Sequence, residues 1–276
     1  MLGKLLKYEM KSTSRFMWII YGAVIVMGLL AGIMLRLDLA LSGGSVEDGF
    51  IISSETASTL QVIMTFLTFS IYVLLLIAME VLTLVMIVMR FWKNMLGSEG
   101  YLTHTLPVPS WMLVTSKLII AVLWELMAAV TAIISGSLIL GISGLRREIF
   151  ADFSIREIFA SFREMGIELD LGKWIFMIIF AALAGILQFY FAMSLGNLSN
   201  KNKILFSVLA YLGINIAVSI VSGIIQFARM MIMQNALSTG AVFSILGWPT
   251  LILYAVLAVG FFFGTYLIME NRLNLE

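Results

Sequence analysis

Two carboxylates in this 276-residue chain, Glu80 and Glu125, lie inside long apolar stretches. Glu80 comes ten residues before Arg90, and Glu125 comes eight residues after Lys117. If both stretches are helical, these spacings correspond to about 15 Å and about 12 Å, so the two acids are predicted to lie at similar depth. A carboxylate at membrane depth costs free energy and usually faces protein or a water-filled cavity. This pair is therefore the first candidate for a functional site.

Two interpretations of the pair remain open. In the first, Glu80 and Glu125 line a substrate pathway and meet a cationic or hydrogen-bonding cargo. In the second, each acid is protonated or hydrogen-bonded to an adjacent helix and serves packing or gating. Gln188 and Asn215 also lie in apolar stretches, where single amides more commonly join helices than bind substrates.

Other reactive groups are scarce. The chain has no cysteine and one histidine, His104, which excludes disulfides, thiolate ligands, paired-imidazole zinc sites and Cys/His nucleophilic couples. No G-x-x-x-x-G-K-[ST] loop is present to bind a triphosphate. His104 has no apparent nucleophile to act on as a base. We therefore expect no catalytic residue, no metal site, no nucleic-acid partner and no nucleotide hydrolysis within this chain.

The candidate residues must be positioned by helices. Most of the chain consists of six apolar runs, at residues 16–37, 62–89, 112–142, 174–195, 204–228 and 242–268. Each run reaches the about 20 residues that a helix needs to cross about 30 Å of hydrocarbon. Hydrophobic residues make up 61% of the chain and charged residues 12%, against roughly 45–50% and about 25% in soluble domains. The sequence predicts an all-α integral membrane protein with one transmembrane domain over residues 1–276.

The charges are distributed unevenly between the connections. With the N-terminus in the cytoplasm, the inner segments hold ten cations and four acids, whereas the outer segments hold seven cations and ten acids. The outer connection 38–61 has four acids and neither Lys nor Arg. Cytoplasmic connections carry an excess of Lys and Arg, so we expect a multi-pass protein with both termini in the cytoplasm.

The first fifteen residues have two different faces when drawn as a helix. One face carries the cations Lys4, Lys7, Lys11 and Arg15, and the opposite face carries Leu2, Leu5, Leu6, Met10 and Phe16. This pattern predicts a helix lying in the inner membrane interface ahead of the first span, with its cations on anionic lipid headgroups. Glu9 points toward the apolar side, either as a snorkelling carboxylate or as a contact with a neighbouring helix or subunit.

Two further segments carry boundary signals. In the outer connection 143–173, Ser154 and Glu157 match a capping box, and apolar residues recur on one helical face up to Gly166. We expect a pair of amphipathic outer helices there, with a solvated linker as the alternative. In the last apolar run, Pro249 predicts either a short re-entrant piece over 242–247 or a kinked continuous helix.

The connection between the second and third spans, residues 90–111, is dense in aromatic and apolar side chains. Water disfavours so many exposed apolar groups, so some must dock on this protein, on the bilayer interface or on a partner. Gly97 and Gly100 can bracket a short helix or turn, and Pro107 and Pro109 stiffen the return to the membrane. A stiff, partly apolar element of this kind favours a mechanical contact.

Three segments of the sequence resemble a known family. They are Leu5-Leu6-Lys7-Tyr8-Glu9-Met10-Lys11, the stretch Glu99-Gly100-Tyr101-Leu102-Thr103-His104-Thr105-Leu106-Pro107-Val108-Pro109, and Ser116-Lys117-Leu118. These segments, together with the six-span layout, resemble bacterial type-2 permeases of ATP-binding-cassette (ABC) exporters.

The resemblance implies a permease that pairs with an identical or similar chain and binds two separate ABC ATPase subunits, which hold ATP and magnesium. In such exporters the loop between spans two and three carries a coupling helix that docks on the ATPase. By analogy, the ATPase-coupling residues are Gly97, Glu99, Gly100, Tyr101, His104, Leu106 and Pro107, and the N-terminal interfacial helix (Lys4, Lys7, Glu9, Lys11 and Arg15) braces them.

Relatives of this compact kind resemble exporters of peptides such as bacteriocins, of drugs or of lipids, located in the bacterial plasma membrane. Membrane lipids are then the remaining expected partners. The alternative is a proton-coupled secondary transporter in which Glu80 and Glu125 carry the protons.

Overall fold

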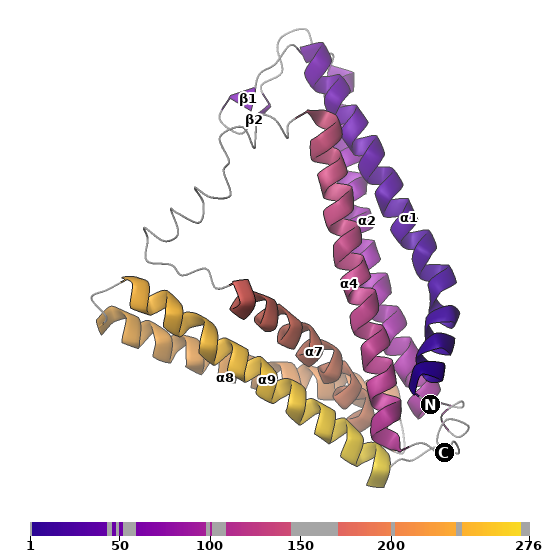
Figure 1. Cartoon of the computed structure of the whole chain (residues 1–276), viewed down its shortest axis with the longest axis vertical. Coiled ribbons are helices and arrows are strands. Elements are labelled where there is room, and N and C mark those ends of the chain that lie inside the picture. The colour runs from indigo at the N-terminus through magenta and orange to yellow at the C-terminus, as the bar shows by residue number, and fades with distance from the viewer. Residues whose placement is uncertain are drawn as a thin grey trace. The chain divides into compact units, whose positions relative to one another are not determined.

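The computed structural model of the chain describes residues 2–42, 46–47, 50–51, 59–97, 100, 109–144, 171–199, 202–235 and 239–271. Its elements in chain order are α1 (Leu2–Ser42), β1 (Val46–Glu47), β2 (Phe50–Ile51), α2 (Thr59–Phe91), the π-helix η1 (Trp92–Leu96), α4 (Ser110–Ser143), α7 (Leu171–Gly196), α8 (Lys203–Asn235) and α9 (Thr239–Asn271) (Figure 1). The strands form a two-residue antiparallel pair with Val46 opposite Ile51. Otherwise the regular structure of the described residues is helical, as expected for an all-α protein.

Among the described residues, six helices are long and apolar enough to cross a membrane. Each apolar run identified in the sequence falls within one of them, in the order α1, α2, α4, α7, α8 and α9. The prediction of six spans is therefore confirmed at the level of helix number, length and composition. It succeeds because a spanning helix must be apolar over about 20 residues whatever it packs against.

The predicted beginning of the chain is wrong in one respect. α1 runs without interruption from Leu2 to Ser42, so residues 2–15 are not a separate helix but the first turns of α1. Between Gly3 and Gly22 the segment contains neither Gly nor Pro, so nothing in it stops the helix. Asp38, expected in the outer connection, also lies in α1, where it is buried.

The structure also shows where α2 ends and whether α9 is interrupted at its proline. The helical run of α2 continues through η1 to Leu96, so the connection to α4 begins later than residue 90. Pro249 lies inside α9, which is one continuous helix, so the re-entrant alternative is wrong. The expected pair of outer amphipathic helices falls almost entirely on residues 145–170, which lie outside the described residues.

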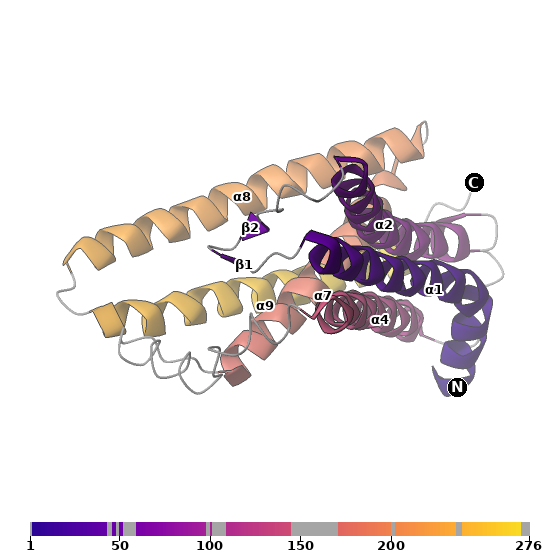
Figure 2. The same ribbon diagram turned by 90° about the horizontal axis from the view of Figure 1, so that it is seen from above.

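The chain divides into two compact units. The smaller unit comprises Lys7–Met86 and Leu123–Ile155, and the larger unit comprises Met1–Leu6, Ile87–Val122 and Arg156–Glu276. Most of α1 and α2 and the second half of α4 belong to the smaller unit. The whole of α7, α8 and α9 belongs to the larger unit, and Figure 2 shows α8 and α9 along their length.

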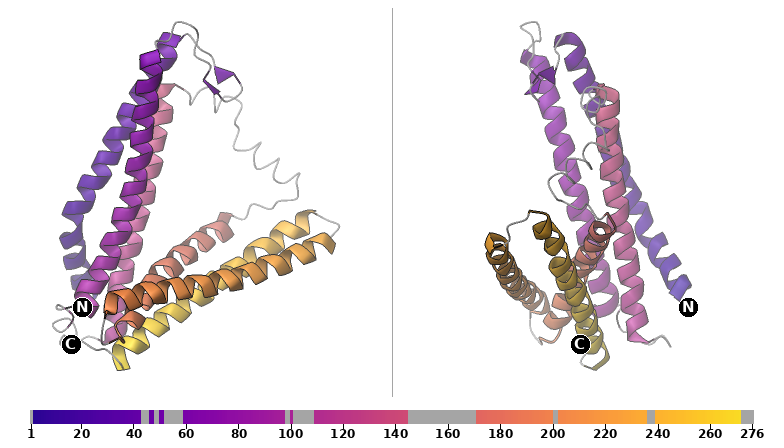
Figure 3. Two further views of the ribbon diagram at one scale, coloured as in Figure 1. Left: turned by 180° about the vertical axis from the view of Figure 1, so that it is seen from behind. Right: turned by 60° about the vertical axis from the view of Figure 1, so that its left-hand side comes forward.

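In the smaller unit, α1 and α4 approach closely at two glycines. Figure 3 shows the long helices α1, α2 and α4 from two sides. A Cβ atom on Gly28 would lie 3.0 Å from Cβ of Ser135, and one on Gly32 would lie 3.1 Å from Cα of Ile139. The four-residue step is the same on both helices, so α1 and α4 run parallel. Small residues four apart allow such backbone contact between membrane helices.

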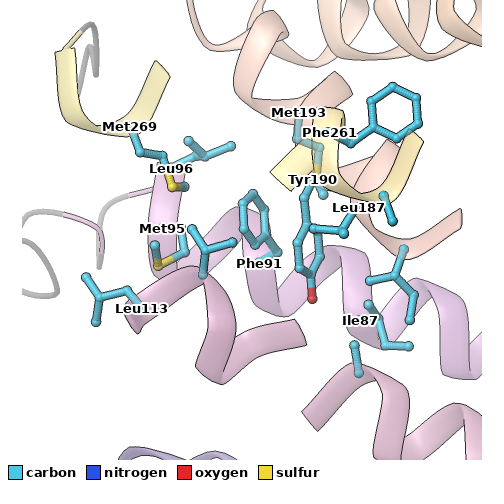
Figure 4. Packing of buried hydrophobic residues seen from close by; sticks show 14 of the residues in the cluster. Ile87, Phe91, Met95, Leu96, Leu113, Leu187, Tyr190, Met193, Phe261 and Met269 are labelled. Carbon is cyan, nitrogen blue, oxygen red and sulfur yellow. The ribbon is translucent and has the colours of Figure 1, made fainter. Parts of the chain in front are cut away.

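In the larger unit, α7 packs along both α8 and α9, whereas α8 and α9 meet at few points. Aromatic rings fill the contacts. The rings of Phe91 and Tyr190 stack with centroids 3.9 Å apart and an interplanar angle of 10°, and those of Phe191 and Phe261 with centroids 5.6 Å apart. Figure 4 shows Phe91 and Tyr190 facing each other within a cluster of buried apolar side chains.

Candidate functional site

The hydroxyl group of Tyr21 lies at the centre of a polar cluster in the smaller unit. It donates a hydrogen bond to the backbone carbonyl of Trp124 at 3.0 Å and lies 3.3 Å from the hydroxyl of Thr83. Thr83 in turn donates to the carbonyl of Met79 at 2.8 Å. Because each hydroxyl has one proton and both are already used, the contact between Tyr21 and Thr83 is the weakest of the three. One buried side chain of α1 thus joins α4 and α2.

Glu80 and Glu125 flank this cluster. Glu125 directly follows Trp124, and Glu80 comes three residues before Thr83, within one turn of α2. Tyr21 lies within electrostatic range of both carboxylates, and Glu125 is within range of Glu80. The two acids therefore lie at the same level of the smaller unit, as their spacing from Arg90 and Lys117 predicts.

The carboxylates of Glu80 and Glu125 do not hold the helices of the smaller unit together. Glu80 is exposed and Glu125 is half-buried, and neither makes a hydrogen bond or an ion pair to another residue in the part of the chain that the structure describes. Helix packing of the smaller unit uses neighbouring side chains instead. This arrangement leaves both acids able to meet a proton, a cation, water or a hydrogen-bonding group from outside the unit.

Two further hydrogen bonds hold the same three helices. The indole Nε1 of Trp124 donates to the hydroxyl of Thr13 at 2.9 Å, and the hydroxyls of Tyr72 and Ser135 lie 2.9 Å apart beside Gly28. Interhelical hydrogen bonds in membranes contribute about 0.6 kcal/mol each on average. Together with the bond from Tyr21 to Trp124, these contacts contribute about 2 kcal/mol and fix the register around the acid pair.

The second candidate site is the connection between α2 and α4, of which the structure describes the beginning and the end. η1 ends at Leu96 and is capped by Gly97, whose amide donates to the carbonyl of Trp92 at 2.8 Å. The amide of Gly100 donates to the carbonyl of Gly97 at 2.8 Å. A Cβ atom on Gly97 would lie 3.0 Å from the carbonyl oxygen of Lys93, tighter than most contacts of this kind. A backbone hydrogen bond thus joins the two glycines that the sequence analysis singles out.

The described start of this connection packs into a buried apolar cluster of the larger unit. Met95 and Leu96 of η1 are buried there together with Leu113 of α4 and Met269 of α9 (Figure 4), and the half-buried Leu5 of α1 packs against the same cluster. The start of α1, the end of α2, the start of α4 and the end of α9 therefore meet at one end of the larger unit. The start of α1 and the end of α9 therefore lie on the same side of the larger unit as the connection between α2 and α4.

The structure describes some of the remaining predicted residues and not others. Glu99, Tyr101, His104, Leu106 and Pro107 lie outside the described residues. Lys4, Lys7, Lys11 and Arg15 are exposed along one face of α1, as the helical wheel predicts, and Glu9 is half-buried. Asn215 donates to the carbonyl of Tyr211 within its own helix rather than to a neighbouring helix. The amide nitrogen of Gln188 is buried without a hydrogen-bond partner among the described residues.

Sequence reasoning missed the residues that organise the acid pair. Tyr21, Trp124 and Thr83 carry no distinctive spacing, and nothing in their types sets them apart. The pair Gly28 and Gly32, by contrast, forms a G-x-x-x-G pattern that signals close helix packing and could have placed α1 against α4. No group of three or more metal-ligating side chains gathers among the described residues.

Comparisons of the chain with models of protein families, with curated proteins and with solved structures found no match. The functional assignment therefore depends on the residues and geometry described above.

Proposed function

We propose that this chain is the membrane-spanning permease subunit of an ABC exporter. A separate ATPase subunit binds and hydrolyses ATP with magnesium, and the permease, paired with an identical or similar chain, exports a peptide, drug or lipid-like substrate. Antimicrobial peptides are one such class. Six apolar helices, the absence of a nucleotide-binding loop in the sequence and the family-like segments around Lys7 and Tyr101 support this proposal.

The observation that carries the proposal is the attachment of the connection between α2 and α4. Its base, Met95 and Leu96, is buried against residues of α1, α4 and α9 in the larger unit. Close-packed interiors are poorly compressible and transmit displacement. A push applied to residues 97–107 by a docked ATPase would therefore reach four helix ends together.

In this mechanism, closure of two ATPase subunits on ATP moves the coupling segment at Gly97–Pro107. The cluster at its base passes the movement to the transmembrane helices, which rock around the substrate pathway. The cationic face of α1, which includes Lys4, Lys7 and Lys11, holds the N-terminal turns against anionic headgroups while this happens. The chain lies in the bacterial plasma membrane with both termini in the cytoplasm.

Affinity purification of the tagged chain from its native membrane tests the assignment. We expect an ATPase subunit to co-purify in stoichiometric amount, and ATP hydrolysis by the complex to require magnesium. Repeated purification of the chain with no ATPase, under conditions that retain other ABC complexes, would reject the proposal.

The coupling segment is tested by replacing Tyr101 and Leu106 with Asp. The charged side chains should weaken ATPase association and export while leaving insertion of the six spans unchanged, because the substitutions lie outside the apolar runs. The matched control replaces Tyr101 with Phe and Leu106 with Met, which keeps the apolar surface and should preserve both activities. Normal ATPase association and export in the Asp variant would remove the coupling role.

A second candidate function is proton-coupled transport by this chain alone. The accessible, unpaired carboxylates of Glu80 and Glu125 at one level of the smaller unit favour it. Uptake driven by a pH gradient in liposomes that contain only this chain would support the alternative, and Glu80→Gln with Glu125→Gln would abolish it. For the ABC exporter, the same variants should insert normally, and loss of export would place the acids on the substrate pathway.

A further inference from the structure

A cavity of about 530 Å³ opens in the larger unit between the end of α2, the end of α7 and the start of α8. Its size falls within the roughly 300–1,000 Å³ of typical ligand pockets. The lining is almost wholly apolar, with Val88 and Met89 from α2, Phe189 and Met193 from α7, and Val208 from α8 among its residues. Flexible methionine side chains suit a ligand of variable shape.

Local contacts fix the walls of this cavity. The rings of Phe189 and Tyr211 stack with centroids 4.4 Å apart and an interplanar angle of 13°, which joins α7 to α8. Gly196 lies so close to Ser207 that a Cβ atom would overlap its backbone, so the end of α7 and the start of α8 are in direct contact. The cavity is thus part of the packed structure of the unit.

Two lysines line this cavity and an adjoining one. Lys93 of η1 is one of its lining residues, and an adjoining cavity that shares Trp92, Ile204 and Val208 is lined by Lys203 and Asn202. No Asp or Glu lines either cavity among the described residues. Lys203 also opens α8, where the positive end of the helix dipole adds to the field.

The cavity lies at a membrane boundary. Lys93 falls near the end of the second candidate span, Val62–Leu96, and Lys203 is the first residue of the fifth, Lys203–Ala228. An indole such as that of Trp92 favours the level of the headgroups. The apolar volume therefore lies on the hydrocarbon side of two lysines, an arrangement complementary to a molecule with an apolar tail and an anionic head.

We propose that this cavity binds one anionic phospholipid, with its phosphate between Lys93 and Lys203 and an acyl chain along Val88, Phe189 and Val208. The lysine stems extend along the apolar wall while their ammonium groups reach the phosphate. A neutral phospholipid supplies the same chains but no net negative charge to match two cations. The site requires only that the chain span a membrane, so it does not depend on an ATPase partner.

Native mass spectrometry of the purified full chain tests the site. The probes are dioleoyl phosphatidylglycerol and dioleoyl phosphatidylcholine, titrated separately into the detergent-solubilised protein. We expect one phosphatidylglycerol to be retained with clearly higher affinity than phosphatidylcholine. Inorganic phosphate and glycerol 3-phosphate at millimolar concentration should not displace it, because the acyl chain contributes to binding. Displacement by these soluble anions, or equal retention of both lipids, would overturn the proposal.

The charge requirement is tested with Lys93→Gln and Lys203→Gln together. Retention of phosphatidylglycerol should weaken by about thirtyfold, the factor expected from two cations near a membrane surface. The control variant Arg36→Gln removes an exposed cation of α1 to which no headgroup contact is assigned and should retain the lipid. Equal loss in both variants would show diffuse attraction to the surface and reject the site.

Two more variants keep the test decisive if the double Gln variant fails to fold. Lys93→Arg with Lys203→Arg preserves both charges and should retain the lipid. Val208→Trp fills the apolar volume and leaves both lysines in place, so it should reduce lipid retention while the protein stays monodisperse in gel filtration. Unchanged retention by Val208→Trp would show that the acyl chain does not occupy this cavity.

Discussion

The two units of this protein hold their helices together by different means. In the smaller unit, hydroxyl groups and an indole join α1, α2 and α4, and glycines bring α1 against α4. In the larger unit, stacked aromatic rings and buried methionines join α7 to α8, α9 and the end of α2. Hydrogen bonds define one register and one depth, whereas stacked rings and methionines can adjust to small shifts. The fixed unit holds the acid pair, and the more adaptable unit holds the base of the proposed coupling segment.

The largest expected effect concerns the glycine contact of the larger unit. In Gly196→Ala, the added Cβ would overlap the backbone of Ser207, and two helix backbones cannot relax as a side chain can. We expect the free energy of unfolding, measured by titration from mild detergent into sodium dodecyl sulfate, to fall by about 3 kcal/mol.

The matched control is Gly185→Ala on the same helix, where nothing lies within 4 Å of the added Cβ. Alanine is the better helix former by about 1 kcal/mol, so this control should be neutral or stabilising. Equal stability of the two variants would show that α7 and α8 are not in backbone contact.

An intermediate effect is expected in the smaller unit. In Gly28→Ala, the added Cβ lies 3.0 Å from Cβ of Ser135 and 3.1 Å from its carbonyl oxygen. We expect a loss of about 1–2 kcal/mol in the same titration, because α1 must move away from α4. Gly136→Ala, with open space around its Cβ, provides the baseline on α4, and a loss as large in that variant would contradict the proposed contact.

The smallest effect separates the two kinds of packing directly. Tyr21→Phe removes the hydroxyl that donates to the carbonyl of Trp124 and should cost about 0.6–1.7 kcal/mol. Tyr211→Phe keeps the stacking on Phe189 and removes a hydroxyl that makes no hydrogen bond among the described residues, so it should be nearly neutral. Equal costs for the two variants would contradict the distinction between the units.

The sequence predicted the elements better than their contacts. Apolar runs identify spanning helices because every span must be apolar, but for that reason they do not indicate which face meets protein and which meets lipid. α2 and α8, for instance, are apolar on all sides, and exposed Leu, Ile and Phe side chains outnumber buried ones on α8. In soluble proteins the polar face gives this information; here two G-x-x-x-G patterns, Gly28 with Gly32 on α1 and Gly260 with Gly264 on α9, carried packing signals.

The candidate site was predictable only in part. The common level of Glu80 and Glu125 follows from their spacing to Arg90 and Lys117, because helix rise is constant. That Tyr21 lies between them could not be predicted, since it depends on the rotation of α1 about its axis. The separate interfacial helix was predicted wrongly because the amphipathic pattern of residues 1–15 describes a helix in any setting and gives no position for its end.

α8 contributes almost nothing to the interior of the larger unit apart from its contact with α7. A spanning helix with little protein packed against it needs side chains that are soluble in lipid, but it does not need side chains of a particular shape. In a saturation mutagenesis screen, most positions of its outer half should accept any of Leu, Ile, Val, Phe or Met. Sequence drift between descendants of this protein should therefore concentrate in its fifth span.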